Sequence, residues 1–209
     1  MSQTGVKFSV MSENSKSYIS DKEAVSQLVN AVRSLVNRKQ NRLEFADFIH
    51  RMLHIPTEEL LDNSTIFSEF MFAKLVLECT ILDSDEDQLR ICSPELGRHL
   101  KDLSYQTFSR RYFNELKQNT PTGQKINVTY DDILRHLANY EKILKEEGLS
   151  YFGSLFAKRI FQALKVSRKR FKPSHGTMLA MILSTHGLGM YWSSLFSTHV
   201  VEIENASEV

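Results

Sequence analysis

The run of residues 165–172 (KVSRKRFK) carries the clearest chemistry, because five of its eight residues are Lys or Arg. Cations gathered this closely neutralise phosphate groups, and the planar guanidinium of Arg can donate two parallel hydrogen bonds to one phosphate. The run also contains Phe171, an aromatic side chain that could stack on an unpaired base. Its composition therefore predicts contact with nucleic acid, either DNA or RNA, or with another polyanion.

The charges around this run are segregated along the chain. No Asp or Glu occurs in the 54 residues from Gly148 to Val201, whereas the first 147 residues carry 19 Lys and Arg against 22 Asp and Glu. A basic segment next to apolar sequence attracts phosphates, acidic proteins or anionic lipid. The expected nucleic-acid-binding residues are the cations of this stretch and the aromatic among them: Lys158, Arg159, Lys165, Arg168, Lys169, Arg170, Phe171 and Lys172.

The same cations allow other interpretations. Lys169–Lys172 followed by Pro173 also fits a short nuclear-import signal, or a segment that docks on an acidic protein surface. In a further alternative these cations bind no partner and only complement the carbonyl dipole at a solvated helix end. The helix before the run is basic and amphipathic, so contact with an anionic membrane is a further, less favoured alternative. The sequence does not separate these partners, because phosphate, carboxylate and lipid headgroups attract the same residues.

Three polar residues at helical spacing, Asp47, His50 and His54, could share one face of a helix. Two histidines one turn apart can bind zinc, but a zinc site needs further ligands. The Glu of a His-Glu-x-x-His motif is missing, because Arg51 follows His50. We therefore expect neither a metal site nor another cofactor.

No motif in the sequence indicates catalysis. Cys79, Cys92 and His99 lack a known spacing of zinc ligands. The segment His186–Gly189 contains two glycines, but without a preceding strand it is expected to join two helices and not to hold a phosphate. A Ser–His–Asp triad is defined by geometry that spacing does not reveal. The sequence therefore predicts a binding protein and not an enzyme.

Helical periodicity predicts the scaffold for these residues: an all-α fold, a compact bundle of about eight helices. Ser20–Glu23 and Thr129–Asp132 have the spacing of capping boxes and mark two helix starts, and Ser93 before Pro94 marks a third. The segment Ile66–Leu82 is apolar nearly all the way round, which indicates a buried central helix.

The basic run is expected to begin at the end of a helix over roughly Ser150–Ser167, after an earlier helix that ends at Gly148. The apolar side chains of this helix share one face, and most of its cations lie elsewhere: Phe152, Phe156, Ile160 and Leu164 form the face. We expect that face to pack into the core while the cations remain in solvent.

Composition divides the chain into five expected parts: a flexible arm (1–19), an N-terminal helical bundle (20–117), a linker (118–129), a C-terminal basic helical region (130–201) and an acidic tail (202–209). The linker contains Pro121–Gly123, a strong turn signal where the bundle could divide into two lobes.

The expected location is intracellular, in the nucleus or cytoplasm. The N-terminus lacks the apolar core of a signal peptide. The most apolar window, Thr177–Phe196, is interrupted by polar residues and glycines, so it fails the requirement of about 20 apolar residues for a spanning helix. Two cysteines do not make a disulfide framework, and both are expected to be reduced. The chain is therefore expected to be neither secreted nor transmembrane.

Overall fold

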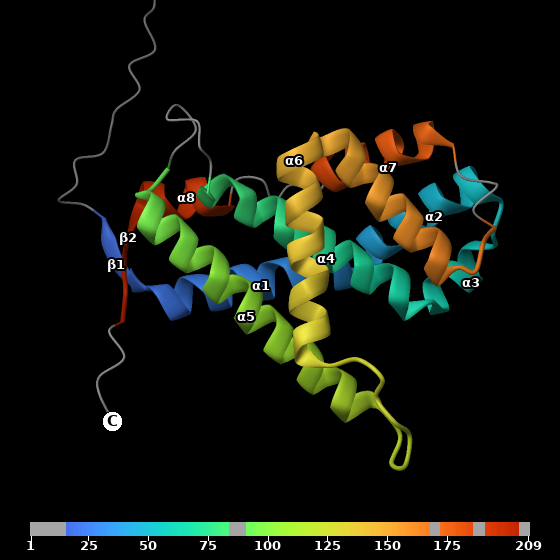
Figure 1. Cartoon of the computed structure of the whole chain (residues 1–209), viewed down its shortest axis with the longest axis horizontal. Coiled ribbons are helices and arrows are strands. Elements are labelled where there is room, and N and C mark those ends of the chain that lie inside the picture. The colour runs from blue at the N-terminus through green and yellow to red at the C-terminus, as the bar shows by residue number, and fades with distance from the viewer. Residues whose placement is uncertain (1–15, 84–90, 168–171, 186–190, 205–209) are drawn as a thin grey trace, which may run out of the picture.

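The computed structural model describes residues 16–83, 91–167, 172–185 and 191–204, which form a helical bundle (Figure 1). Its helices are α1 (Asp21–Asn37), α2 (Lys39–Leu53), α3 (Thr57–Asp62), α4 (Ser64–Thr80), α5 (Pro94–Asn119), α6 (Tyr130–Ala163), α7 (Pro173–Thr185) and α8 (Tyr191–Thr198). A 3₁₀ turn, η2 (Ile81–Asp83), follows α4, and two four-residue strands pair with each other. Within the described residues no helix is both long and apolar enough to cross a bilayer. The predicted all-α fold is confirmed.

Helix α4 lies at the centre of the core, as the apolar segment 66–82 predicts. It contacts α1, α5, α6 and α7, and its Phe70 is only 1% exposed. The Phe70 ring stacks on Phe45 of α2 at 4.5 Å between centroids, and on Phe156 of α6 at 6.3 Å. The core therefore combines side chains from before and after the 118–129 connection.

Side-chain caps determine where three of the helices begin. Ser20 and Ser93 each accept a hydrogen bond from the backbone amide three residues further on, at 3.2 and 3.3 Å. Thr129 accepts from the Asp132 amide at 3.1 Å, and the Asp132 carboxylate accepts from the Thr129 amide at 2.9 Å. This reciprocal pair is a complete capping box. The three helix starts predicted from the sequence are confirmed.

Helix α6 is broken at Gly148, where φ is 79° and ψ is 179°. Glycine reaches this conformation easily because it has no Cβ. One helical segment thus ends at Gly148 and another follows it, as predicted. The second segment ends at Ala163, so the predicted end at Ser167 is wrong. The physical reason is that Lys165 adopts a left-handed conformation, with φ of 54°, and closes the helix early.

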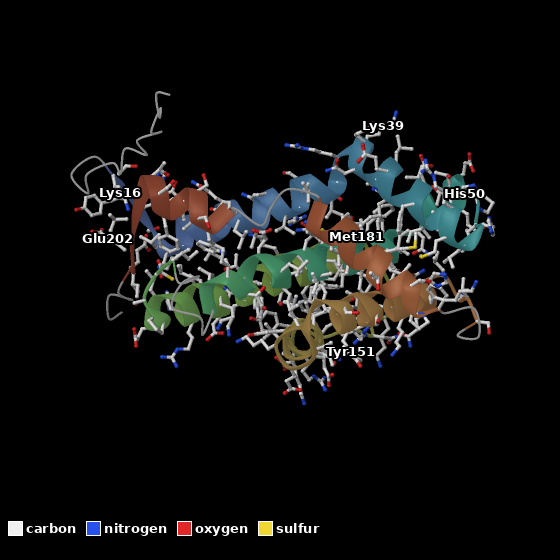
Figure 2. All side chains as sticks on the ribbon, turned by 90° about the horizontal axis from the view of Figure 1, so that it is seen from above. Lys16, Lys39, His50, Tyr151, Met181 and Glu202 are labelled. Atoms are coloured by element: carbon white, nitrogen blue, oxygen red, sulfur yellow. The ribbon has the colours of Figure 1, made fainter. Side chains whose placement is uncertain are left out.

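Two strands form a small parallel ribbon at one end of the molecule (Figure 1), where Figure 2 labels Lys16 and Glu202. Strand β1 (Ser17–Ser20) pairs with β2 (His199–Glu202). The predicted arm over 1–19 is therefore too long, because its last three residues belong to β1. The predicted tail likewise loses Glu202 to β2. Residues 1–15 of the arm and 205–209 of the tail lie outside the described part of the chain.

A buried carboxylate connects this ribbon to the bundle. Asp21, 2% exposed, accepts hydrogen bonds from His99 Nε2 of α5 at 2.6 Å and from the backbone amide of Glu204 at 3.3 Å. Burial raises the pKa of Asp21, but the hydrogen bonds from His99, Glu204 and Lys22 outweigh burial and hold this pKa below its ordinary value. An ionised Asp21 thereby ties together α1, α5 and the segment after β2.

Candidate functional site

The predicted basic site lies at the connection between α6 and α7. Lys165 and Lys172 are exposed at the two ends of this connection, and Lys158 is exposed on the last turns of α6. Arg159, next to Lys158, is half-buried. The other four predicted residues lie outside the described part of the chain: Arg168, Lys169, Arg170 and Phe171. The structure thus places half of the predicted site and puts two of its cations at the ends of one connection.

Lys165 is also the residue that terminates α6. Its amide donates to the Gln162 carbonyl at 3.0 Å, and the Val166 amide donates to the Phe161 carbonyl at 2.9 Å. These two bonds form a Schellman motif, in which glycine usually occupies the left-handed position. A residue with a Cβ costs about 1–2 kcal/mol in this conformation. The backbone of Lys165 is therefore strained, while its positive charge lies at the helix end that favours cations.

The start of α7 is stabilised by His175. The amide of Lys172 donates to His175 Nδ1 at 3.1 Å, and the His175 ring lies 5.6 Å from the Phe161 ring. Burial and then the positive charge of Lys172 lower the pKa of His175, which favours the neutral ring that this hydrogen bond needs. Pro173 begins the helix, and the positive end of the α7 dipole faces the basic connection.

Two glycines allow α7 to pack closely on the second half of α6. A Cβ added to Gly153 would lie 2.3 Å from the Gly176 carbonyl oxygen, and a Cβ added to Gly176 would lie 2.4 Å from Ser154 Oγ. Figure 2 labels Tyr151 and Met181 on these two helices. Neither glycine can be enlarged without moving a helix, so the pair holds α7 closely against α6.

The two histidines predicted to share a face lie at the end of α2. His50 Nδ1 donates to the Ile55 carbonyl at 2.7 Å, and His54 caps α2 with a left-handed φ of 58°. Asp47 accepts a hydrogen bond from Thr57 at 3.1 Å. In the part of the chain that the structure describes, no three or more His, Cys, Asp or Glu residues are grouped to hold a metal ion.

The two cysteines are free thiols. Cys79 is fully buried in α4, and burial raises the pKa of its thiol. Cys92 is half-buried, and burial raises its pKa as well. His99, considered with these cysteines as a possible zinc ligand, is hydrogen-bonded to Asp21. The segment His186–Gly189 lies outside the described residues, between the two helices α7 and α8 that it was expected to join.

A hydrogen-bonded cluster on α4 and α6 was not recognised from the sequence. Glu69 of α4 is 8% exposed, and its Oε2 accepts from His136 Nε2 at 2.9 Å and from the Tyr140 hydroxyl at 2.8 Å. The sequence did contain a signal for it. A charged residue inside an apolar helix needs a polar partner when the helix is buried, and Glu69, Lys74 and Glu78 all interrupt the apolar run.

Lys74 and Glu78, both 2% exposed, hold the C-terminal helices against α4. The Lys74 ammonium donates to the Leu183 carbonyl of α7, and the Glu78 carboxylate accepts from the Tyr191 amide at the start of α8. Burial lowers the pKa of Lys74 to about 8 and raises the pKa of Glu78 to about 7, while the charge of each residue partly opposes the effect on the other. This pair is sealed from solvent, so its role is structural.

Comparison with known families, curated proteins and solved structures gave no match to this chain. A function must therefore be inferred from the chain's own charges and contacts. Of the features above, the α6–α7 connection carries two cations that the structure shows exposed, Lys165 and Lys172, whereas the Lys74–Glu78 pair and Asp21 are enclosed.

Proposed function

We propose that this chain is a non-enzymatic nucleic-acid-binding protein that contacts phosphates through the connection between α6 and α7. The observation that carries the proposal is the exposure of Lys165 and Lys172 at the two ends of this connection. The intervening sequence adds three more cations, Arg168, Lys169 and Arg170, within a stretch that contains no acid. Binding of this kind draws its free energy mainly from phosphate neutralisation and depends little on base sequence.

The surrounding structure favours such a contact in two ways. The close packing of Gly153 against Gly176 holds together the two helices that flank the connection, which limits the entropy lost when it binds. The positive end of the α7 dipole adds to the attraction of an anion at the same place. Phe171 lies among the cations in sequence, so stacking on an unpaired base would give single strands an advantage over duplex.

Acidic side chains near the C-terminal end of α6 allow a further test of the proposed phosphate contact. Asn63 Nδ2 donates to the Ala163 carbonyl at 3.3 Å, which places the end of α3 beside the end of α6. Helix α3 carries three exposed acids: Glu58, Glu59 and Asp62. If phosphates bind at the connection, these acids repel them. Their replacement by Gln, Gln and Asn should then strengthen binding.

The main experiment is a titration of labelled single-stranded and duplex oligonucleotides with the full chain over a series of salt concentrations. The logarithm of affinity should fall linearly with the logarithm of salt. Replacing Arg168, Lys169 and Arg170 together by Ala should reduce that slope by roughly two to three. Phe171→Ala should cost about 1–3 kcal/mol on single strands and much less on duplex.

A matched control removes three exposed cations from α5 and the loop after it: Arg110, Lys117 and Lys125. This variant changes the net charge equally and should keep the wild-type slope. The proposal fails if the wild-type chain shows no salt-dependent binding to either oligonucleotide. Binding to anionic vesicles, to an acidic protein or to an import receptor in place of oligonucleotides would assign the same cations to those partners.

A further inference from the structure

A cleft of about 390 Å³ opens between α4, α5 and the first half of α6. Its apolar wall includes Phe72, Tyr112 and Val128, and Val128 is 41% exposed. Glu69 and His136 lie deeper, with side chains 11% and 17% exposed. The volume is near the lower end of the roughly 300–1,000 Å³ of small-ligand pockets. The cleft therefore suits one long side chain better than a large ligand.

The Glu69 carboxylate gives this cleft a negative charge that the protein compensates only in part. Both of its hydrogen bonds, from His136 and Tyr140, reach Oε2. Among the described residues, none donates a hydrogen bond to Oε1, and the one ion pair of Glu69 is with His136, which is charged only when protonated. A largely buried carboxylate without a permanent cation favours the arrival of one from outside.

The aromatic rings make the same cleft favourable for an organic cation. The Phe72 ring lies 4.8 Å from the His136 ring and 5.1 Å from the Tyr112 ring, measured between centroids. Aromatic faces attract guanidinium and ammonium groups, most strongly where water is partly excluded. The exposed surface of Val128 can cover the aliphatic stem that carries such a group.

We propose that this cleft binds an arginine or lysine side chain of a basic polypeptide partner. The cationic head donates to Glu69 Oε1, while the stem packs against Phe72 and Val128. Asp131 stands at the start of α6 beside Asp132, which lines the cleft but is already paired with Arg135, so Asp131 is the carboxylate that favours a further cation on the same polypeptide. A free amine would lack these additional contacts. The inference does not depend on nucleic-acid binding, which uses residues of the α6–α7 connection.

The test compares two synthetic tripeptides, acetyl-Gly-Arg-Gly-amide and its citrulline counterpart, which keeps the shape of arginine without its charge. Each is titrated into the full chain while NMR follows the methyl signals of Val128 and Ile133, which both line the cleft. The arginine peptide should give saturable shifts. The citrulline peptide should bind about tenfold more weakly or worse, because its ureido group keeps N–H donors but lacks the positive charge that strengthens a hydrogen bond to a carboxylate. Equal binding of the two peptides, or no shift with either, would overturn the proposal.

Variants at Thr65 separate occupation of the cleft from damage to the fold. Thr65 is exposed, lines the cleft and lies one helical turn before Glu69. Thr65→Arg supplies an internal guanidinium and should abolish peptide binding, whereas the uncharged Thr65→Gln should retain it. Unchanged binding by Thr65→Arg would place the peptide elsewhere and reject the site. Free arginine amide that binds as tightly as the peptide would reject a polypeptide as the natural occupant.

Discussion

Lys74→Met should destabilise the fold by about 1–3 kcal/mol at neutral pH, because it leaves the buried Leu183 carbonyl without its donor and removes the charge that partly opposes the raised pKa of Glu78. The pKa of Glu78 shows how much its burial costs in the wild-type protein. Raising this pKa from 4.5 to about 7 corresponds to about 3–4 kcal/mol, at about 1.4 kcal/mol per pH unit. That cost is present even with Lys74 one turn away. Removing Lys74 increases it and also deprives the Leu183 carbonyl of its donor.

The pH dependence distinguishes the two members of this pair. Between about pH 4.5 and 7 folded Glu78 keeps a proton that the unfolded chain releases, so the pair's contribution to stability falls as pH rises. Between about pH 8 and 10.5 the unfolded chain keeps a proton that folded Lys74 has lost, so that contribution rises again. The pair is therefore least stabilising between about pH 7 and 8. In Lys74→Met the rise in stability above pH 8 should vanish, and the fall in stability caused by Glu78 should continue above pH 7.

Urea unfolding followed by circular dichroism from pH 5 to 10 measures these differences between wild type and variant. The double variant Lys74→Met/Glu78→Leu is the matched control, because replacing two buried and oppositely charged residues together by apolar ones is often neutral or stabilising by about 1–4 kcal/mol. It should recover most of the lost stability. A loss below about 1 kcal/mol in Lys74→Met, or a persistent rise above pH 8, would refute the assignment of a coupled buried pair.

Four further changes test other parts of the fold, each by urea unfolding. Phe70→Ala should cost about 3–5 kcal/mol, because it opens a cavity in the centre of the core. Gly153→Ala should cost about 1–3 kcal/mol, because its Cβ would collide with the Gly176 carbonyl; a neutral result would contradict the close packing. Lys165→Gly should stabilise by up to about 1 kcal/mol, whereas Lys165→Ala should not, since alanine keeps the strained Cβ. The pKa of Asp21 is lowered on folding, so its contribution is present above pH 3.8 and is lost as pH falls through the lower, folded value. Asp21→Asn should therefore lose stability at neutral pH, and its stability should depend less on pH in the acid range.

Local features of the sequence predicted the helices well. The capping box at Thr129, the break at Gly148 and the burial of the segment 66–82 all depend on residues within a few turns of one another. Such interactions leave a periodic or positional pattern that can be recognised without the rest of the chain.

Features that join distant segments were missed. Strands β1 and β2 have four residues each and lie about 180 residues apart, too short and too remote for an apolar period to indicate pairing. The partners of Glu69 lie 67 and 71 residues away on another helix. The early end of α6 was missed because lysine is not a residue type that signals a left-handed cap. Of the basic site, the sequence predicted the exposure of Lys165 and Lys172 but not the glycine contacts that hold their helices together.

The pairing of β1 with β2 affects the order in which the protein can fold on the ribosome. Tyr18 is made long before its partner Val200, and at about 5–20 residues per second the interval is roughly 10–40 s. Helices can form during this time because their hydrogen bonds are local, but β1 must wait with its backbone groups unpaired. A nascent chain therefore carries β1 without its partner strand until residues 199–202 have been made.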